Sequence, residues 1–276
     1  MRQLVIISAL MFLSLSLAHG QERDGPSFSI VGDLQRFDYR EYSDQEKLLD
    51  QENGFLPGLL LGIEHSKGPW QFAGQFSYHA GGVTYTGQTN GGEPIATTTR
   101  QQMINAELRT GYQFQQMQNI QSTLYFGAAN HSWQRNIQPT YTSTGLPVRG
   151  LMETYHWWQA FLGANISAQE TSAFCWGLDT RLTRTIAPKI EVDYFGLYDK
   201  VQLGLGERWG FRLAFPMSYT MSQSITLALE PYLEKYALGR SQSATLTSQG
   251  IIQGTVFEPD STGKNYGVLL GIRKFY

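Results

Sequence analysis

The sequence is poor in charge, in cysteine and in helical periodicity. Asp, Glu, Lys and Arg make up 16% of its 276 residues, whereas an average soluble domain has about 25%. The single cysteine, Cys175, excludes an internal disulfide framework and a cluster of thiolate zinc ligands. The 21 basic and 23 acidic residues nearly cancel, so no strong electrostatic field favours nucleic acid as a partner.

Long apolar runs are also rare, and the longest one lies at the N-terminus. A mostly apolar run from Leu4 to Leu17 follows the cationic start at Arg2, and the small residues Ala18 and Gly20 come after it. This order is the pattern of a secretory signal peptide, and the run is shorter than the ~20 residues of a membrane-spanning helix. We therefore predict a signal peptide at 1–20 and a single domain at 21–276.

The mature chain contains a hydrophobic period of two instead. In the segment 104–114 mostly apolar residues occupy the even positions and mostly polar residues the odd ones, which is typical of a β-strand with one apolar face. Similar alternation covers 27–40, 57–65, 70–81, 120–131, 155–167, 173–183, 209–219, 225–234 and 266–273. These segments of about nine to fourteen residues exceed ordinary soluble strands and suffice to cross a bilayer as tilted strands.

The linkers between these segments alternate in length. Short turns fall at 66–69, 115–119, 167–171 and 220–224, and long loops at 42–55, 85–98, 134–152, 184–207 and 239–263. Short turns at one end, long loops at the other and an even strand number are the layout of an outer-membrane barrel. We predict an all-β fold, a transmembrane antiparallel up-and-down β-barrel of about ten strands. A soluble sandwich or lipocalin-like barrel is the alternative, but its narrow interior would have to hold the strongly aromatic face.

The last segment ends in a further pattern. It alternates Tyr266, Val268, Leu270, Ile272 and Tyr276, and Lys274 interrupts the series. In this it resembles the Gram-negative outer-membrane β-barrel proteins, whose last strand alternates apolar residues, ends in an aromatic and is read by the assembly machinery. The resemblance implies localisation in the bacterial outer membrane. It also implies outer-membrane lipid, lipopolysaccharide and the barrel-assembly machinery as partners, while no extracellular ligand is indicated.

With the apolar face towards lipid, the polar face points into the lumen. Its predicted ion network consists of Glu64, Glu107, Arg109, Asp179, Arg181, Arg212, Glu230, Glu234 and Arg273. His79 lies on the same face. A ten-strand bore is only a little wider than one that side chains fill, and arginine and carboxylate groups form bidentate pairs. We therefore expect a largely plugged polar lumen.

Three functions remain open: a non-enzymatic structural or surface-contact role, a narrow channel for small solutes, and an omptin-like or lipid-modifying enzyme. The omptin proteases, which resemble this chain in strand number, use an aspartate pair and an aspartate–histidine couple. Here 85–98 holds only Glu93, and 184–207 holds Asp193 and Asp199 without a histidine. His131 precedes a serine, but its parity directs it inward, away from lipid. We predict no catalytic, cofactor or metal site and favour the non-enzymatic role.

Overall fold

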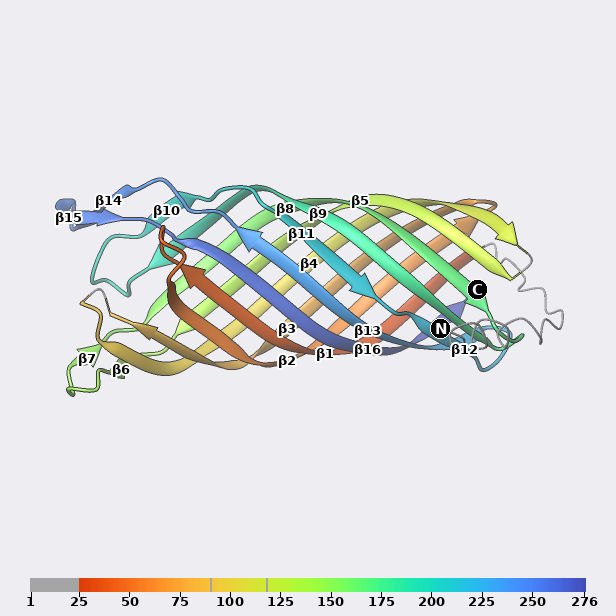
Figure 1. The fold of residues 1–276 in the computed structure, drawn as a ribbon, viewed down its shortest axis with the longest axis horizontal. Coiled ribbons are helices and arrows are strands. Elements are labelled where there is room, and N and C mark those ends of the chain that lie inside the picture. Colours follow the sequence, from red (N-terminus) through yellow and green to blue (C-terminus); the bar gives the residue numbers. More distant parts are fainter. Residues whose placement is uncertain (1–24, 90, 118) are drawn as a thin grey trace, which may run out of the picture.

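The computed structural model describes residues 25–89, 91–117 and 119–276. Within this part of the chain, ten antiparallel wall strands form a closed barrel (Figure 1). The wall strands are β1 (Gly25–Tyr42), β2 (Leu48–Lys67), β3 (Trp70–Gln88), β4 (Pro94–Met117), β5 (Ile120–Ile137), β8 (Leu151–Gln169), β9 (Phe174–Asp193), β11 (Trp209–Ala214) continued by β12 (Met217–Thr220), β13 (Ile225–Leu238) and β16 (Asp260–Phe275). The predicted fold class is confirmed. The predicted signal peptide, 1–20, lies outside the described residues.

The sheet closes because the pairing of neighbouring wall strands continues around the whole ring. β1 pairs with β2 and with β16, and β8 pairs with β9. Closure matters because a bilayer offers no hydrogen-bonding partners for the edge of an open sheet. Pro216, which has no backbone N–H, separates β11 from β12. The wall continues across this break because the N–H of Gly177 donates to the Pro216 carbonyl at 2.8 Å.

The apolar face of the barrel forms a belt around the half that contains the start of β1 and the end of β16. Its exposed members include Phe28, Leu34, Phe55, Ile63, Phe72, Leu108, Leu124, Phe126, Trp158, Leu162, Leu182, Val268, Leu270 and Ile272. The short turns lie at this same end (Figure 1), which corresponds to the periplasmic side of such barrels. We call the exposed apolar residues of this half the apolar belt. Among the described residues, no helix is long and apolar enough to span a membrane.

The wall extends well beyond the apolar belt. β4 has 24 residues, whereas a tilted strand needs about 9–11 to cross the hydrocarbon layer. The predicted long loops at 42–55, 85–98 and 134–152 are therefore wrong in extent, because β2 already begins at Leu48 and β3 ends only at Gln88. Three small additions lie at this far end: β6 (Thr140–Tyr141) with β7 (Pro147–Val148), β10 (Val201–Gly204), and the hairpin of β14 (Ala244–Ser248) and β15 (Ile251–Val256).

The polarity of the two faces changes along each strand. On β1 the outward residues Phe28, Ile30 and Leu34 are apolar and exposed, but farther on Phe37 and Tyr39 point inward and are fully buried. This far part of the barrel, which we call the outer half, thus hides its apolar residues as a water-soluble barrel does. The reversal follows from the surroundings, because only the belt meets lipid.

The face assignment predicts opposite outcomes for two substitutions on β4. Leu108 is 72% exposed in the belt, so Leu108→Arg should impair assembly, because an arginine near the bilayer midplane costs roughly 2–4 kcal/mol. Gln113 faces the lumen, where the Gln71 amide donates to it at 2.9 Å, and Gln113→Arg should be tolerated. Heat-modifiable gel mobility of both variants is the measurement. Equal tolerance would contradict the assignment.

Candidate functional site

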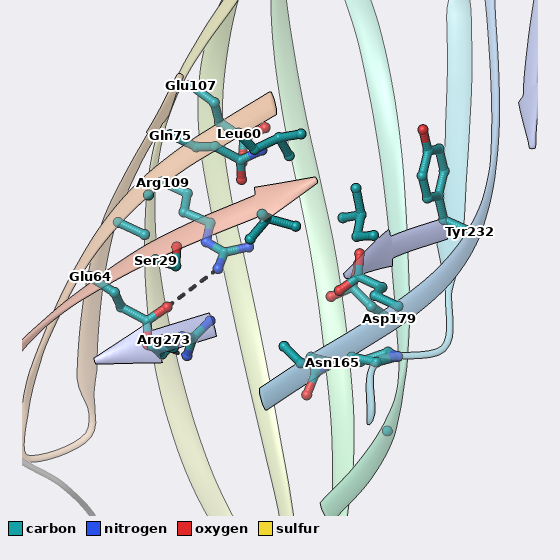
Figure 2. A pocket seen from close by; sticks show the side chains of 18 of the residues that line it. Ser29, Leu60, Glu64, Gln75, Glu107, Arg109, Asn165, Asp179, Tyr232 and Arg273 are labelled. Atoms are coloured by element: carbon teal, nitrogen blue, oxygen red, sulfur yellow. Dashed lines mark ion pairs between the residues drawn. The ribbon is translucent and has the colours of Figure 1, made fainter. Parts of the chain in front are cut away.

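The half of the barrel inside the membrane encloses a cavity of about 780 Å³. It reaches the periplasmic turns at Ser66, Ser172 and Thr220. All the residues of the predicted ion network line it, as do His79 and Cys175. Figure 2 shows Glu64, Glu107, Arg109, Asp179 and Arg273 around it. The structure therefore brings these side chains together in one place. It also shows that they surround a space of ligand size rather than fill the bore.

Near the periplasmic mouth, one carboxylate is shared between two arginines. Glu64 on β2 lies 3.5 Å from Arg109 on β4 and 3.6 Å from Arg273 on β16 (Figure 2). The two arginines come from strands on either side of β2, so the group ties three parts of the wall together. Its net charge is positive, because two cations face one anion.

Deeper in the cavity the arginines have closer partners. Arg181 on β9 forms a bidentate pair with Glu107 on β4, with distances of 2.7 and 3.1 Å. Arg212 on β11 lies 2.5 Å from Glu230 and 3.9 Å from Asp179. Bidentate and charge-assisted bonds of this kind are among the stronger polar contacts in proteins.

Glu234 differs from the rest of the predicted network. It faces Arg212 directly across β11 and β13, but that arginine bonds to Glu230 instead. Within the described residues Glu234 forms no close ion pair, although its carboxylate acts electrostatically on Arg212. Its membership of the ion network stays a prediction. Arg212 forms its ion pairs with Glu230 and Asp179 instead. The sequence does not reveal which acids an arginine contacts.

The sequence prediction missed a polar group that centres on Asp33. Nε2 of His79 lies 2.8 Å from the Asp33 carboxylate, and the Tyr232 hydroxyl donates to the same oxygen at 2.8 Å. Each ring reaches Asp33 across an intervening strand, and a Cβ at Gly58 or Gly267 would overlap it. Asp33 lies in the alternating segment 27–40 with inward parity, so the signal was present in the sequence.

A layer of aromatic residues closes the cavity on the outer side. Phe37, Tyr39, Trp133, Tyr155 and Trp157 are at most 7% exposed. The Trp133 ring centroid lies 4.9 Å from that of Tyr39 and 4.7 Å from that of Tyr155. These rings, which we call the aromatic layer, pack with aliphatic residues from β2, β3 and β9 into one buried core. Side chains fill the bore at this level.

Beyond the aromatic layer, one arginine is surrounded by acids. Arg135 is fully buried and lies 2.8 Å from Glu41, 3.1 Å from Glu52 and 2.7 Å from Glu153. Glu258 accepts a hydrogen bond of 2.6 Å from the Tyr155 hydroxyl, and the Tyr85 hydroxyl donates to Asp50 at 3.3 Å. We call the five carboxyl groups with Arg135 the outer acid cluster: Glu41, Asp50, Glu52, Glu153 and Glu258.

Burial controls the protonation of the outer acid cluster. It raises the pKa of Glu153 from 4.5 to about 7, although Arg135 opposes the shift. Burial and the neighbouring Glu41 raise the pKa of Asp50 and of Glu258 well above their ordinary values. One cation cannot neutralise five buried anions, so some of these groups keep their protons near neutral pH.

The residues of the C-terminal pattern all lie on the outside. Tyr266, Val268, Leu270, Ile272 and Tyr276 are between 45% and 72% exposed. Their strand, β16, pairs with both β1 and β13, so it closes the barrel. Recognition by the assembly machinery remains a prediction.

Neither a protein-family model nor a curated protein matches the sequence. The outer membrane protease OmpT from Escherichia coli matches the fold with a TM-score of 0.65 and 9% identity, over 96% of this chain and 99% of that chain. The translocator domain of the autotransporter NalP from Neisseria meningitidis reaches 0.43 at 11% identity, over 93% and 91%. The toluene transporter TodX of P. putida reaches 0.36 at 9% identity, over 92% and 91%.

The similarity to OmpT is one of fold, since identity is 9%. The closed barrel, its apolar belt and this shared fold define a bacterial outer-membrane β-barrel protein. The predicted architecture and the predicted localisation in the outer membrane are confirmed.

Removal of Arg212 should destabilise the barrel. Arg212→Ala leaves Glu230 and Asp179 without this cation, and breaking a buried pair by removing one partner typically costs about 3–5 kcal/mol. Arg40→Ala is the control, because Arg40 pairs with Asp38 on the outside and its side chain is 39% exposed, where a pair contributes at most about 1 kcal/mol. The unfolding temperature of both variants is measured by gel mobility. A drop of equal size in both would contradict the role of Arg212.

The outer acid cluster should make stability fall as pH rises through about 7, the pKa of folded Glu153. A raised carboxyl pKa means that the folded protein binds more protons than the unfolded chain, so the contribution is complete below the unfolded pKa and is lost above the folded one. We expect a loss of roughly 1–3 kcal/mol between about pH 5 and pH 8. Thermal unfolding at both pH values tests this, and Glu153→Gln should reduce the difference.

Proposed function

We propose that the protein is a non-enzymatic outer-membrane barrel that does not conduct and that holds its outer loops at the cell surface. One observation supports this most strongly: side chains of the aromatic layer and of the outer acid cluster pack into the interior of the outer half. Trp133, Arg135 and Tyr155 are each at most 1% exposed. A solute channel would instead need a continuous polar path.

The far end of the barrel offers apolar groups for contact with a partner. The tip of the β14–β15 hairpin exposes Ile251 by 67% and Ile252 by 72%. Asp199, in the β9–β10 connection, holds this hairpin in place by accepting bonds from the Thr247 hydroxyl at 2.7 Å and the Gly250 N–H at 3.0 Å. Exposed apolar residues on an ordered loop are typical of contact surfaces.

An enzymatic role has less support in the geometry. A substrate at the cell surface would approach the barrel from the side of the outer acid cluster. In this cluster Glu41, Glu52, Glu153 and Glu258 are each at most 8% exposed. Buried carboxyls already bonded to Arg135 and Tyr155 offer a peptide or lipid no access. The cluster is better explained as part of the barrel core.

The proposed lipid partners fit the outer surface just beyond the apolar belt. Lys235 on β13 and Lys264 on β16 are exposed and lie directly opposite each other. On the neighbouring β1, Asp38 lies opposite Lys264, and the exposed Arg36 lies two residues away. Like charges that face each other destabilise a sheet, whereas an anionic headgroup between them removes the repulsion. This supports lipopolysaccharide as a partner of this face. The exposed residues of β16 likewise support the assembly machinery as a partner.

Planar-bilayer recording tests the proposal. The unmodified barrel should show no steady nanosiemens-scale conductance, and a Trp133→Ala/Trp157→Ala variant should conduct, because it removes two large rings from the aromatic layer. Trp158→Ala is the matched control, since Trp158 points outward and is 55% exposed. Steady conductance of the unmodified protein would overturn the proposal in favour of a narrow channel for small solutes.

A further inference from the structure

The cavity inside the membrane has a well-defined inner end. It lies against the aromatic layer, where the His131 ring stacks on Trp157 at 4.7 Å and the Trp157 ring lies 6.2 Å from that of Tyr236. Glu234 precedes Tyr236 by two residues on β13, and Asn265 on β16 lies directly opposite Glu234. We call the space enclosed by His131, Trp157, Glu234, Tyr236, Asn265 and the neighbouring Asp33 the blind end.

The blind end contains several hydrogen-bond acceptors that have no donor. Oδ1 of Asp33 and Oδ1 of Asn265 are buried and unpartnered within the described residues. Both residues are at most 7% exposed. A buried acceptor without a donor costs free energy, so these atoms indicate a site that a donor from a ligand or from water completes.

His131 adds a further acceptor. Its Nδ1 lies 2.6 Å from Oδ1 of Asn105, and the amide of Asn105 donates to Ser77 at 3.1 Å, which orients the carbonyl oxygen towards the histidine. Nδ1 therefore carries the proton, and Nε2 of the neutral ring is an acceptor. Nε2 is buried and has no donor in hydrogen-bonding geometry in the described part of the chain, and the Gln159 side chain is a polar neighbour of the ring.

The charge of the cavity also favours a cation. Six carboxylates (Asp33, Glu64, Glu107, Asp179, Glu230 and Glu234) and four arginines line it, so the carboxylates outnumber the arginines by two. The four arginines are engaged with Glu64, Glu107, Asp179 and Glu230. Asp33 is already bonded to His79 and Tyr232 through one oxygen. Within the described residues the carboxylate without a close partner is Glu234, beside the rings of the blind end, and aromatic faces attract cations.

We propose that the blind end binds a small primary amine that enters from the periplasmic side. An alkylammonium group carries three N–H donors and one positive charge, which matches acceptors at Glu234, Asn265 and His131 beneath aromatic rings. The indole N–H of Trp157 is one unpaired donor at the same place, and it suits a ligand with an additional acceptor. Because the outer half is closed, a ligand reaches the cavity through the periplasmic mouth.

Ligand-observed NMR on the full barrel in detergent micelles tests the proposal. The probes are cadaverine, a charged diamine, and 1,5-pentanediol, its neutral analogue of equal length. Cadaverine should bind and the diol should not, because only the diamine brings charge. If the diol binds as well as the diamine, or if cadaverine does not bind, the proposal is overturned whatever the variants do.

Substitution locates the site. Glu234→Gln keeps the shape and removes the charge, and it should weaken cadaverine binding by roughly tenfold or more, since bonds to charged groups contribute that much. Glu191→Gln is the control, because Glu191 is exposed on the outside and pairs with Lys200 at 3.5 Å. Equal weakening in both variants would show nonspecific attraction and overturn the site. The conductance experiment does not affect this outcome, because amine binding does not require an open bore.

Discussion

The structure depends on one constraint, the absence of hydrogen-bonding partners for the backbone inside a bilayer. The sheet must therefore close, and a closed sheet with a period of two sends every second side chain inward. In the belt this rule places polar groups in the lumen, where they surround a cavity. In the outer half, water lies on the outside, so the same geometry collects aromatic and aliphatic side chains inside. A single wall thus encloses two very different interiors.

Inside this wall, contacts between distant strands arise where a large ring lies over a glycine. Tyr125 passes over Gly163 to donate to Asp179 at 2.8 Å, as Tyr232 and His79 pass over glycines to reach Asp33. A strand pair alone brings together only direct neighbours. These crossings connect second neighbours, so they stiffen the wall and hold carboxylates in defined positions. The arrangement of the cavity follows from where glycines and tyrosines alternate in the sequence.

The sequence predicted the fold, the faces of the belt and the side chains that line the cavity, because lipid imposes a strong alternation on the residues that touch it. It did not predict the outer half. There the apolar residues move from the outward to the inward positions, as Leu34 and Phe37 on β1 show. The alternation in the sequence is interrupted where this change occurs, so these parts of the strands resemble loops. Arg135 shares the inward parity of His131 and could have been placed by extending that strand. The choice of Arg212 between Glu230 and Glu234 depends on side-chain geometry that no sequence pattern encodes.

The outer acid cluster also bears on how the barrel is completed. Its members come from β1, β2, β5, β8 and the segment before β16, and Arg135 lies 94 residues from Glu41 along the chain. Such a group has no local precursor, and contacts of long sequence separation form late and slowly. Arg135 takes its three acid partners from β1, β2 and β8. Glu258 meets the Tyr155 hydroxyl only when the segment before β16 is in place. Only the closed barrel therefore contains the complete cluster. This makes closure cooperative and leaves an incomplete barrel less stable.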